Sequence, residues 1–316
     1  MTSMIFFTII FNNGLNASVG NIMGFFTSFG IFSAALYKLP DCYLYYLQAK
    51  PWFERLTPIL KEEPERNNST KAIEDVSGNI DVRHLSFAYS EDAHIVLDDI
   101  SFSVKAGEYL AIVGPSGCGK STLLNLLLGF NRQDKGKIYY DNRDLDDIDK
   151  KSLRKNFGVV LQDGDLIAGS ILDNILISNP DATLQDVDDV LKKVDLFDEV
   201  QQMPMGVNTL LSEGSGLISG GQKQRILIAR AIVAKPKILF FDEATSALDN
   251  ITQAHIVESL NKIGGTRIVI AHRLSTIINC DRIIVLNEGK IAEMGTYKEL
   301  MNNKNIFYDL VQRQIA

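Results

Sequence analysis

The sequence predicts an α/β fold: a core sheet of parallel strands with helices between them, an antiparallel β subdomain and a helical insert. Three observations predict it. Continuous apolar runs at 238–241, 268–271 and 283–286 are typical of parallel strands buried on both faces. Shorter runs earlier in the chain alternate between apolar and polar residues, which is typical of antiparallel strands. A helical pattern between 170 and 200 separates the two groups and predicts the insert.

Composition makes most of the chain resemble an acidic soluble domain. Residues 1–37 contain no Asp, Glu, Lys, Arg or His, so the net charge of −7 belongs entirely to residues 38–316. That part shows no basic footprint for nucleic acid, and we expect no nucleic-acid partner. The cysteines, Cys42, Cys118 and Cys280, are odd in number and widely spaced, which favours a reducing compartment over a disulfide framework.

The N-terminal region predicts one membrane helix. The apolar stretch 19–39 has roughly 20 residues, which as a helix is about 30 Å long and matches the hydrocarbon core of a bilayer. Lys38, Lys50 and Arg55 follow it, so the positive-inside rule places the rest of the chain on the cytoplasmic side of the cell membrane. We therefore expect a partial transmembrane domain at 1–64, which ends in a cytoplasmic extension of the helix.

Two other interpretations of this stretch stay open. A secretory signal peptide would need a basic n-region, which is missing. The stretch is also apolar enough to be a buried helix of a soluble domain. The polar residues that follow, 65–79 with Asn67 and Asn68 near their centre, predict a linker, and we expect the second domain to occupy 80–316.

The second domain opens with strands. Residues 80–87 alternate as a half-buried strand, and 100–104 and 137–140 do the same, so together they predict the antiparallel sheet. In the helical insert, Thr183 is placed to cap a helix over 184–194.

A phosphate-binding loop lies between a predicted strand at 109–113 and a predicted helix at 121–128. Residues 114–121 read G-x-x-x-x-G-K-[ST], the pattern in which glycines let backbone N–H groups close around phosphate oxygens at a helix N-terminus. An accidental glycine-rich turn would lack the flanking strand and helix, so we expect a nucleotide site. Its predicted binding residues are Gly114, Pro115, Ser116, Gly117, Cys118, Gly119, Lys120, Ser121 and Thr122.

Within this loop, two side chains have predicted roles. Lys120 is expected on the β- and γ-phosphates, and the Ser121 hydroxyl on Mg²⁺. The apolar strand 238–241 ends in two carboxylates, Asp242 and Glu243. Asp242 is expected to hold Mg²⁺ as well, and Glu243 to polarise water for attack on the γ-phosphate. The alternative is a pair of solvated acids at a strand end.

A third motif opens an apolar helix at 226–233. Its residues are Ser219, Gly220, Gly221 and Gln222, and on their own they would also suit an ordinary helix cap. Together with the phosphate loop and the acidic strand, they resemble the signature motif of the ATP-binding cassette (ABC) family. The resemblance covers 80–316 and implies a phosphate-loop NTPase cassette that binds ATP with Mg²⁺.

The resemblance also implies roles for residues outside these motifs. Tyr89 is similar to the aromatic residue that stacks on adenine, Gln162 to the glutamine that contacts Mg²⁺ and signals to the membrane domain, and His272 to the histidine that senses the γ-phosphate. Nucleotide is expected between two cassettes, in a homodimer or heterodimer, with the signature residues of one facing the ATP of the other. Residues 246–249 are expected to form a loop at that interface.

Upstream, the chain departs from the family. Exporters of this type carry several membrane helices before the cassette, whereas 1–64 has room for one and a fragment. The chain thus resembles the C-terminal part of an exporter half, similar to bacterial peptide or bacteriocin exporters, which implies an ATPase that drives export with transmembrane helices as partners. A soluble cassette ATPase without transport, and a nucleotide-binding fragment without transport competence, are the alternatives. The transported substrate is left open.

Overall fold

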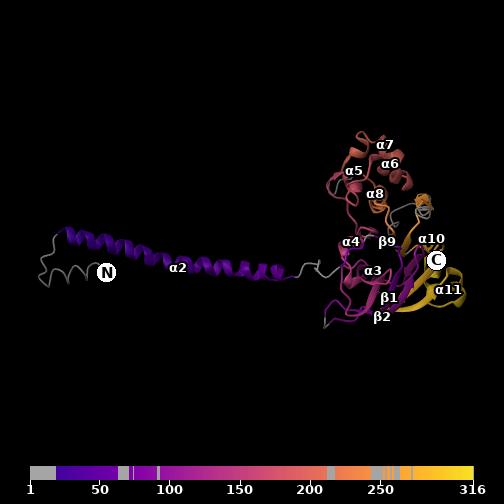
Figure 1. Cartoon of the computed structure of the whole chain (residues 1–316), viewed down its shortest axis with the longest axis horizontal. Coiled ribbons are helices and arrows are strands. Elements are labelled where there is room, and N and C mark those ends of the chain that lie inside the picture. Colours follow the sequence, from indigo (N-terminus) through magenta and orange to yellow (C-terminus); the bar gives the residue numbers. More distant parts are fainter. Residues whose placement is uncertain are drawn as a thin grey trace. The chain divides into compact units, whose positions relative to one another are not determined.

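The computed structural model describes residues 19–62, 71–73, 75–90, 93–211, 218–242, 252, 255–256, 258–259, 264–271 and 273–315. The chain divides into two compact units, Met1–Pro64 and Glu65–Ala316. Figure 1 labels α2 of the first unit and several helices and strands of the second.

The described part of the first unit is one helix, α2 (Val19–Lys61), which continues through three prolines. The helix expected over 19–39 and its extension thus form a single element. Across the described residues, no helix is both long and apolar enough to cross a membrane. The membrane span expected over 19–39 stays a prediction.

A six-stranded sheet lies at the centre of the second unit, in the order β12-β11-β3-β10-β9-β6. Its strands are β3 (Tyr109–Val113), β6 (Phe157–Val160), β9 (Ile238–Asp242), β10 (Thr266–Ile270), β11 (Arg282–Asn287) and β12 (Lys290–Gly295). Neighbours pair in parallel except β11 with β12. Every residue of β3 and β9 is buried, which confirms the predicted parallel strands with both faces covered.

The two faces of this sheet belong to two separate cores. Successive strand residues point to opposite faces, and β3 divides accordingly. Tyr109, Ala111 and Val113 join the core of the insert and the C-terminal helices, whereas Leu110 and Ile112 join the core of the antiparallel sheet and the helix after the phosphate loop. The strand that carries the phosphate loop is therefore held from both sides.

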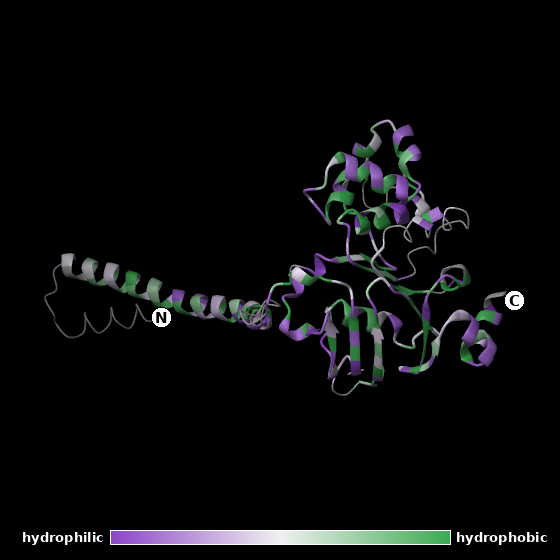
Figure 2. Cartoon of the chain, turned by 45° about the vertical axis from the view of Figure 1, so that its right-hand side comes forward, coloured by the Kyte–Doolittle hydropathy of each residue, from purple (hydrophilic) through white to green (hydrophobic). Residues whose placement is uncertain are grey.

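The second sheet is antiparallel, in the order β2-β1-β4-β5. Its strands are β1 (Ile80–Phe87), β2 (Leu97–Val104), β4 (Lys135–Tyr140) and β5 (Arg143–Asp144). In Figure 2 these strands change between hydrophobic and hydrophilic colours along their length, as the alternating sequence predicts. The antiparallel subdomain is confirmed.

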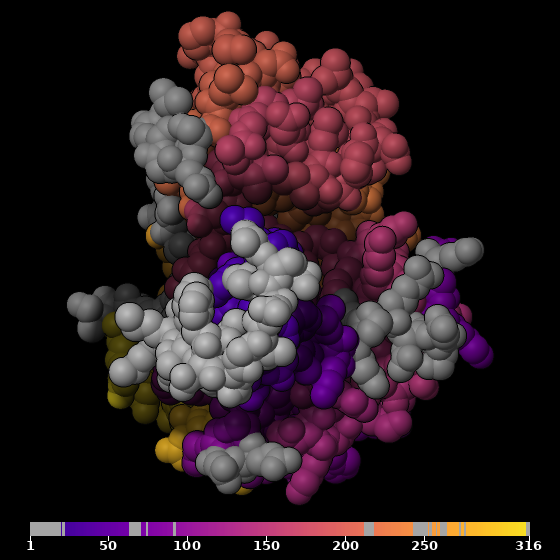
Figure 3. All heavy atoms as spheres, turned by 90° about the vertical axis from the view of Figure 1, so that its left-hand side faces the viewer, coloured from indigo at the N-terminus to yellow at the C-terminus, as the bar shows by residue number. Residues whose placement is uncertain are grey.

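The predicted helical insert is also present, and Figure 3 shows it as a lobe above the rest of the second unit. Its elements are β7 (Gly169–Ser170), α5 (Ile171–Leu176), α6 (Leu184–Lys193), α7 (Phe197–Gln202), η2 (Gly206–Asn208) and β8 (Leu210–Leu211). The expected cap is confirmed, since the Thr183 side chain accepts a hydrogen bond from the Asp186 N–H.

The other elements among the described residues connect the sheets or cover them. They are α3 (Lys120–Leu127), η1 (Leu145–Asp147), α4 (Lys150–Arg154), α8 (Gly220–Ile232), α10 (Leu274–Ile277), α11 (Tyr297–Asn303) and α12 (Ile306–Ile315). Part of the expected linker packs onto this unit: Ile73 and Val76 are buried, and the buried Thr266 hydroxyl donates to the Gly78 carbonyl at 2.6 Å.

Candidate functional site

The phosphate loop joins β3 to α3 and is shaped by glycine. Gly114 has φ +154°, and a Cβ there would lie 2.1 Å from the Leu286 carbonyl oxygen and 2.8 Å from the Cys118 Sγ. Only a residue without a side chain fits between the loop and β11 at this point. The expected strand–loop–helix geometry is therefore present.

Lys120 is 7% exposed, and its ammonium group lies inside the loop. Nζ donates to the carbonyl oxygens of Gly114 and Pro115, both at 2.9 Å, and lies 3.9 Å from the Cys118 Sγ. The buried charge is thus satisfied by two backbone oxygens of the loop itself. A phosphate at the loop would offer this ammonium a charged acceptor in place of neutral ones.

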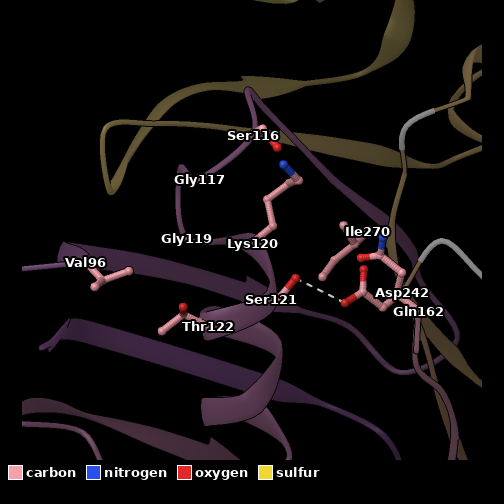
Figure 4. A pocket seen from close by; sticks show the side chains of 10 residues that line it. All are labelled: Val96, Ser116, Gly117, Gly119, Lys120, Ser121, Thr122, Gln162, Asp242 and Ile270. Atoms are coloured by element: carbon pink, nitrogen blue, oxygen red, sulfur yellow. Dashed lines mark hydrogen bonds between the residues drawn. The ribbon is translucent and has the colours of Figure 1, made fainter. Parts of the chain in front are cut away.

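The strand β9 contacts the phosphate loop through its last side chain. Asp242, the last residue of β9, is 5% exposed, and the Ser121 hydroxyl donates to its Oδ2 at 3.1 Å. Gln162, just after β6, lines the same pocket, as Figure 4 shows. Carboxylate, hydroxyl and amide oxygens are the ligands that Mg²⁺ prefers, so the three side chains fit the predicted ion.

The pocket at this junction has a volume of about 240 Å³. Its lining comes from the phosphate loop, the ends of neighbouring core strands and one residue before β2: Val96, Ser116, Gly117, Gly119, Lys120, Ser121, Thr122, Gln162, Asp242 and Ile270. Val96 and Ile270 were not predicted, because nothing in their local sequence marks them. Val96 lies just before β2 and Ile270 ends β10, so the fold brings them to the pocket from distant parts of the chain.

Tyr89 lies beside the loop. Its ring packs edge-on against Phe87 with centroids 5.0 Å apart, and its hydroxyl lies 3.1 Å from the Thr122 Oγ1. The ring is 62% exposed. A largely exposed aromatic ring next to the phosphate site is compatible with the predicted stacking on a base.

The signature residues begin α8. Ser219 is the N-cap: its Oγ accepts from the Gln222 N–H at 3.1 Å, and the Gln222 Oε1 accepts from the Ser219 N–H at 2.8 Å. Gly220 and Gly221 are the first two helical residues, whose N–H groups have no acceptor within a helix. None of these four residues lines the described pocket, so within one chain the signature turn is not part of it.

Three sequence predictions lie outside the described residues. These are the general base Glu243, the γ-phosphate sensor His272 and the interface loop 246–249. Their neighbours place only the adjoining strands: β9 ends at Asp242, and β10 leads to Ala271, which is buried.

Hydrogen bonds and burial shift several pKa values in residues that do not line the pocket. In the insert, bonds from Ser170 lower the pKa of the Asp173 carboxyl, and bonds from Lys235 and Thr183 lower that of Asp186. Burial raises the pKa of the Cys280 thiol to about 12. That thiol is therefore neutral and unreactive near pH 7.

Residues 97–246 match the ABC transporter family. Over 293 residues the chain is 41% identical to the alpha-hemolysin translocation ATP-binding protein HlyB of Escherichia coli O6:H1. This match covers 92% of the chain and 41% of that protein. It is 40% identical over 300 residues to the toxin RTX-III translocation ATP-binding protein of Actinobacillus pleuropneumoniae, with 94% and 42% covered. The chain thus spans about two fifths of the length of these relatives.

A solved structure is similar as well. It is that of a bacterial Atm1-family ABC exporter with ATP bound, with a TM-score of 0.78 and 36% sequence identity. The match covers 83% of this chain and 46% of that one. The predicted cassette fold, a mixed sheet with an antiparallel subdomain, agrees with this neighbour.

Proposed function

We propose that the chain is the ATP-binding and ATP-hydrolysing part of an exporter. Its ABC transporter domain, which is homologous to exporter ATP-binding proteins, supports this. The observation that carries the proposal is the pocket where Lys120, Ser121, Gln162 and Asp242 meet. ATP would lie along the loop, with its phosphates on Lys120 and the N-terminus of α3 and its base on Tyr89.

Ser121 and Asp242 would hold Mg²⁺, with Gln162 beside them. Bound there, the ion would neutralise part of the phosphate charge. Ser121 and Asp242 already share a hydrogen bond at 3.1 Å, so their oxygens lie close enough to converge on one cation. Two further residues keep the roles expected from the sequence. We propose that Glu243 takes the proton of the attacking water and that His272 contacts the γ-phosphate.

Two cassettes would share the nucleotides. The signature turn does not line the pocket of its own chain, and its first two N–H groups offer anion donors at a helix N-terminus. The signature turn would face the γ-phosphate of ATP bound to a second cassette, identical or homologous. The site would then be closed only while ATP bridges the two cassettes. Hydrolysis would remove that bridge and reopen the pair.

The similarity to toxin translocation proteins supports export of a peptide or polypeptide, with the cassette on the cytoplasmic side of the cell membrane and transmembrane helices as its partners. A soluble cassette ATPase without transport is less favoured, because all of these relatives are named as translocation proteins or exporters.

The proposal is tested with the full chain by titrating a fluorescent ATP analogue in the presence of Mg²⁺. Lys120→Ala removes a charge-assisted hydrogen bond to phosphate, worth about 1.5–3 kcal/mol, so the affinity should fall by about 10–100-fold. Lys105→Ala, at an exposed lysine outside the pocket, is the control and should bind like the parent. Equal affinity of Lys120→Ala and the parent would remove the phosphate loop from the proposal.

A further inference from the structure

The signature turn is tied to the insert by a chain of hydrogen bonds. Gln222 Nε2 donates to Glu199 Oε2 at 2.7 Å, and Glu199 Oε1 pairs with Arg225 NH2 at 2.7 Å. Glu199 belongs to α7, whereas Gln222 and Arg225 belong to α8. One carboxylate from the insert therefore joins the first turn of α8 to a buried arginine one turn further on.

The amide of Gln222 has two chemically different ends, and Glu199 decides which end faces Ser219. Only the oxygen can accept the Ser219 N–H, and only the nitrogen can donate to the Glu199 carboxylate. A rotated amide would set two donors against each other at Ser219 and two acceptors against each other at Glu199. The carboxylate thus selects the rotamer in which the cap of α8 is complete.

The other capping boxes among the described residues carry a different kind of side chain at this position. Of the four capping boxes among the described residues, three use an acid at the third helical position: Asp173, Asp186 and Glu299. Both oxygens of a carboxylate accept, so its orientation needs no selection. At α8 the third position is the neutral Gln222. The first turn of α8 itself therefore carries no acid, at a helix N-terminus that is proposed to face phosphate.

Arg225 holds Glu199 in turn. Its side chain is 9% exposed, and besides the ion pair it donates to the Asp195 carbonyl oxygen. Charged groups this buried keep a fixed geometry because they cannot exchange their partners for water. The Glu199 side chain is 42% exposed, so burial alone does not fix its position. The ion pair with Arg225 holds it in place.

We propose that Glu199 is a positioning residue for the composite ATP site: through Gln222 it fixes the signature turn that meets the nucleotide of the second cassette. This inference rests on the proposed function. Removing the carboxylate should leave ATP binding to the phosphate loop unchanged and weaken the ATP-dependent pairing of cassettes.

The test uses the full chain carrying Glu243→Gln, in which hydrolysis is expected to stall, as the parent. Three variants are added to it: Glu199→Ala, Glu199→Gln and Glu199→Ala/Arg225→Met. The last removes both charges of the pair, and replacing both by apolar groups restores stability that is lost when one charge is left unpaired. Asp198→Ala is the matched control, because Asp198 is an exposed acid in the same first turn of α7.

Three quantities are measured for each: the dissociation constant of the dimer in ATP, the affinity for a fluorescent ATP analogue, and the unfolding temperature. We expect the Glu199 variants to dimerise at least about tenfold more weakly, as for a lost hydrogen bond to a charged group. Nucleotide affinity should stay within about twofold, and the double variant should regain the unfolding temperature without regaining the dimer. With Glu243 intact, kcat should fall while nucleotide affinity is kept.

The inference alone would be overturned by parent-like dimerisation of the double variant, or by dimerisation that simply follows the unfolding temperature across the variants. A parent that stays monomeric in ATP would overturn the proposed function, and this inference with it. An Asp198→Ala chain with as large a loss as Glu199→Ala would show a general charge effect and also overturn the inference.

Discussion

The phosphate loop and the signature turn each begin a helix, but the chain holds them in place by different means. At the phosphate loop the backbone does the holding: Gly114 packs against the Leu286 carbonyl, and Lys120 is bound by two carbonyl oxygens of its own loop. At the signature turn side chains do it, through the cap formed by Ser219 and Gln222 and the link to Glu199.

The difference explains which of the two sites is visible in a sequence. The backbone of the phosphate loop requires glycine at fixed positions, so a pattern of eight residues records the loop. Side-chain links reach across the fold, here between residues 23 positions apart. The difference also predicts how each site fails: the loop by steric conflict, and the turn by loss of hydrogen bonds or charge.

The largest effect is expected at the loop. Gly114→Ala would place a Cβ 2.1 Å from a backbone oxygen at φ +154°, and should lower the free energy of unfolding by about 2–5 kcal/mol. Gly117→Ala is the control, since φ is +78° but nothing lies within 4 Å, so only about 1–2 kcal/mol of strain is expected. Urea unfolding of the full chain measures both. Equal losses would show that packing against Leu286 does not matter.

Thiol labelling sharpens the comparison at the loop. Cys42 is exposed and should react first; Cys118 is 6% exposed and should react slowly; Cys280 is buried, with its pKa raised to about 12, and should not react near pH 7. At ATP concentrations about 100 times the dissociation constant, labelling of Cys118 should fall by up to about 100-fold, because only the free form reacts. Mass spectrometry after a labelling pulse gives the rates. Unchanged labelling of Cys118 in ATP would contradict its place at the phosphates.

A smaller effect is expected at the signature turn. Ser219→Ala removes the acceptor for the Gln222 N–H and should lower the free energy of unfolding by about 1 kcal/mol. Ser219→Thr keeps a capping oxygen and should cost only a few tenths of a kcal/mol. The same urea experiment compares the two. A threonine variant as unstable as the alanine variant would mean that the cap is not what holds the turn.

Acid should loosen the insert before the loop. The pKa values of Asp173 and Asp186 are lowered in the folded chain, so their stabilising contribution is present above the unfolded pKa of about 4 and is lost as pH falls through the lower folded values. The Lys120 ammonium in the loop is held by two backbone carbonyl oxygens and by no carboxylate hydrogen bond among the described contacts. Pepsin digestion at decreasing pH should therefore cut within 171–193 before 109–127. If pepsin cut within 109–127 first, the hydrogen bonds of Asp173 and Asp186 would not be what stabilises the insert.

Elements with local signals were predictable from the sequence. The bounds of β1 and β3 were predicted without error, the cap at Thr183 is present, and the core strands lie where the apolar runs are. The strand β12 was not predicted, although the turn at Glu288 and Gly289, both with positive φ, marks a hairpin after β11.

Elements that depend on distant contacts were not predictable. Val96 reaches the pocket from before β2, and Glu199 reaches the signature turn from α7. Neither has a sequence neighbour that identifies it. In the first unit, the apolar stretch correctly predicts a helix, and the placement of that helix in a membrane stays a prediction.

The central claim is that two cassettes share ATP at a site to which one contributes the phosphate loop and the other the signature turn. Size-exclusion chromatography of the Glu243→Gln chain, with and without ATP, tests it most directly. A positioned base is worth about 10²–10⁴ in rate, so this variant should bind ATP without hydrolysing it appreciably and keep the pair closed. We predict an ATP-dependent dimer that Ser219→Arg in the same chain abolishes. A chain that stays the same size in ATP, or that hydrolyses ATP at close to the parent rate, would contradict the claim.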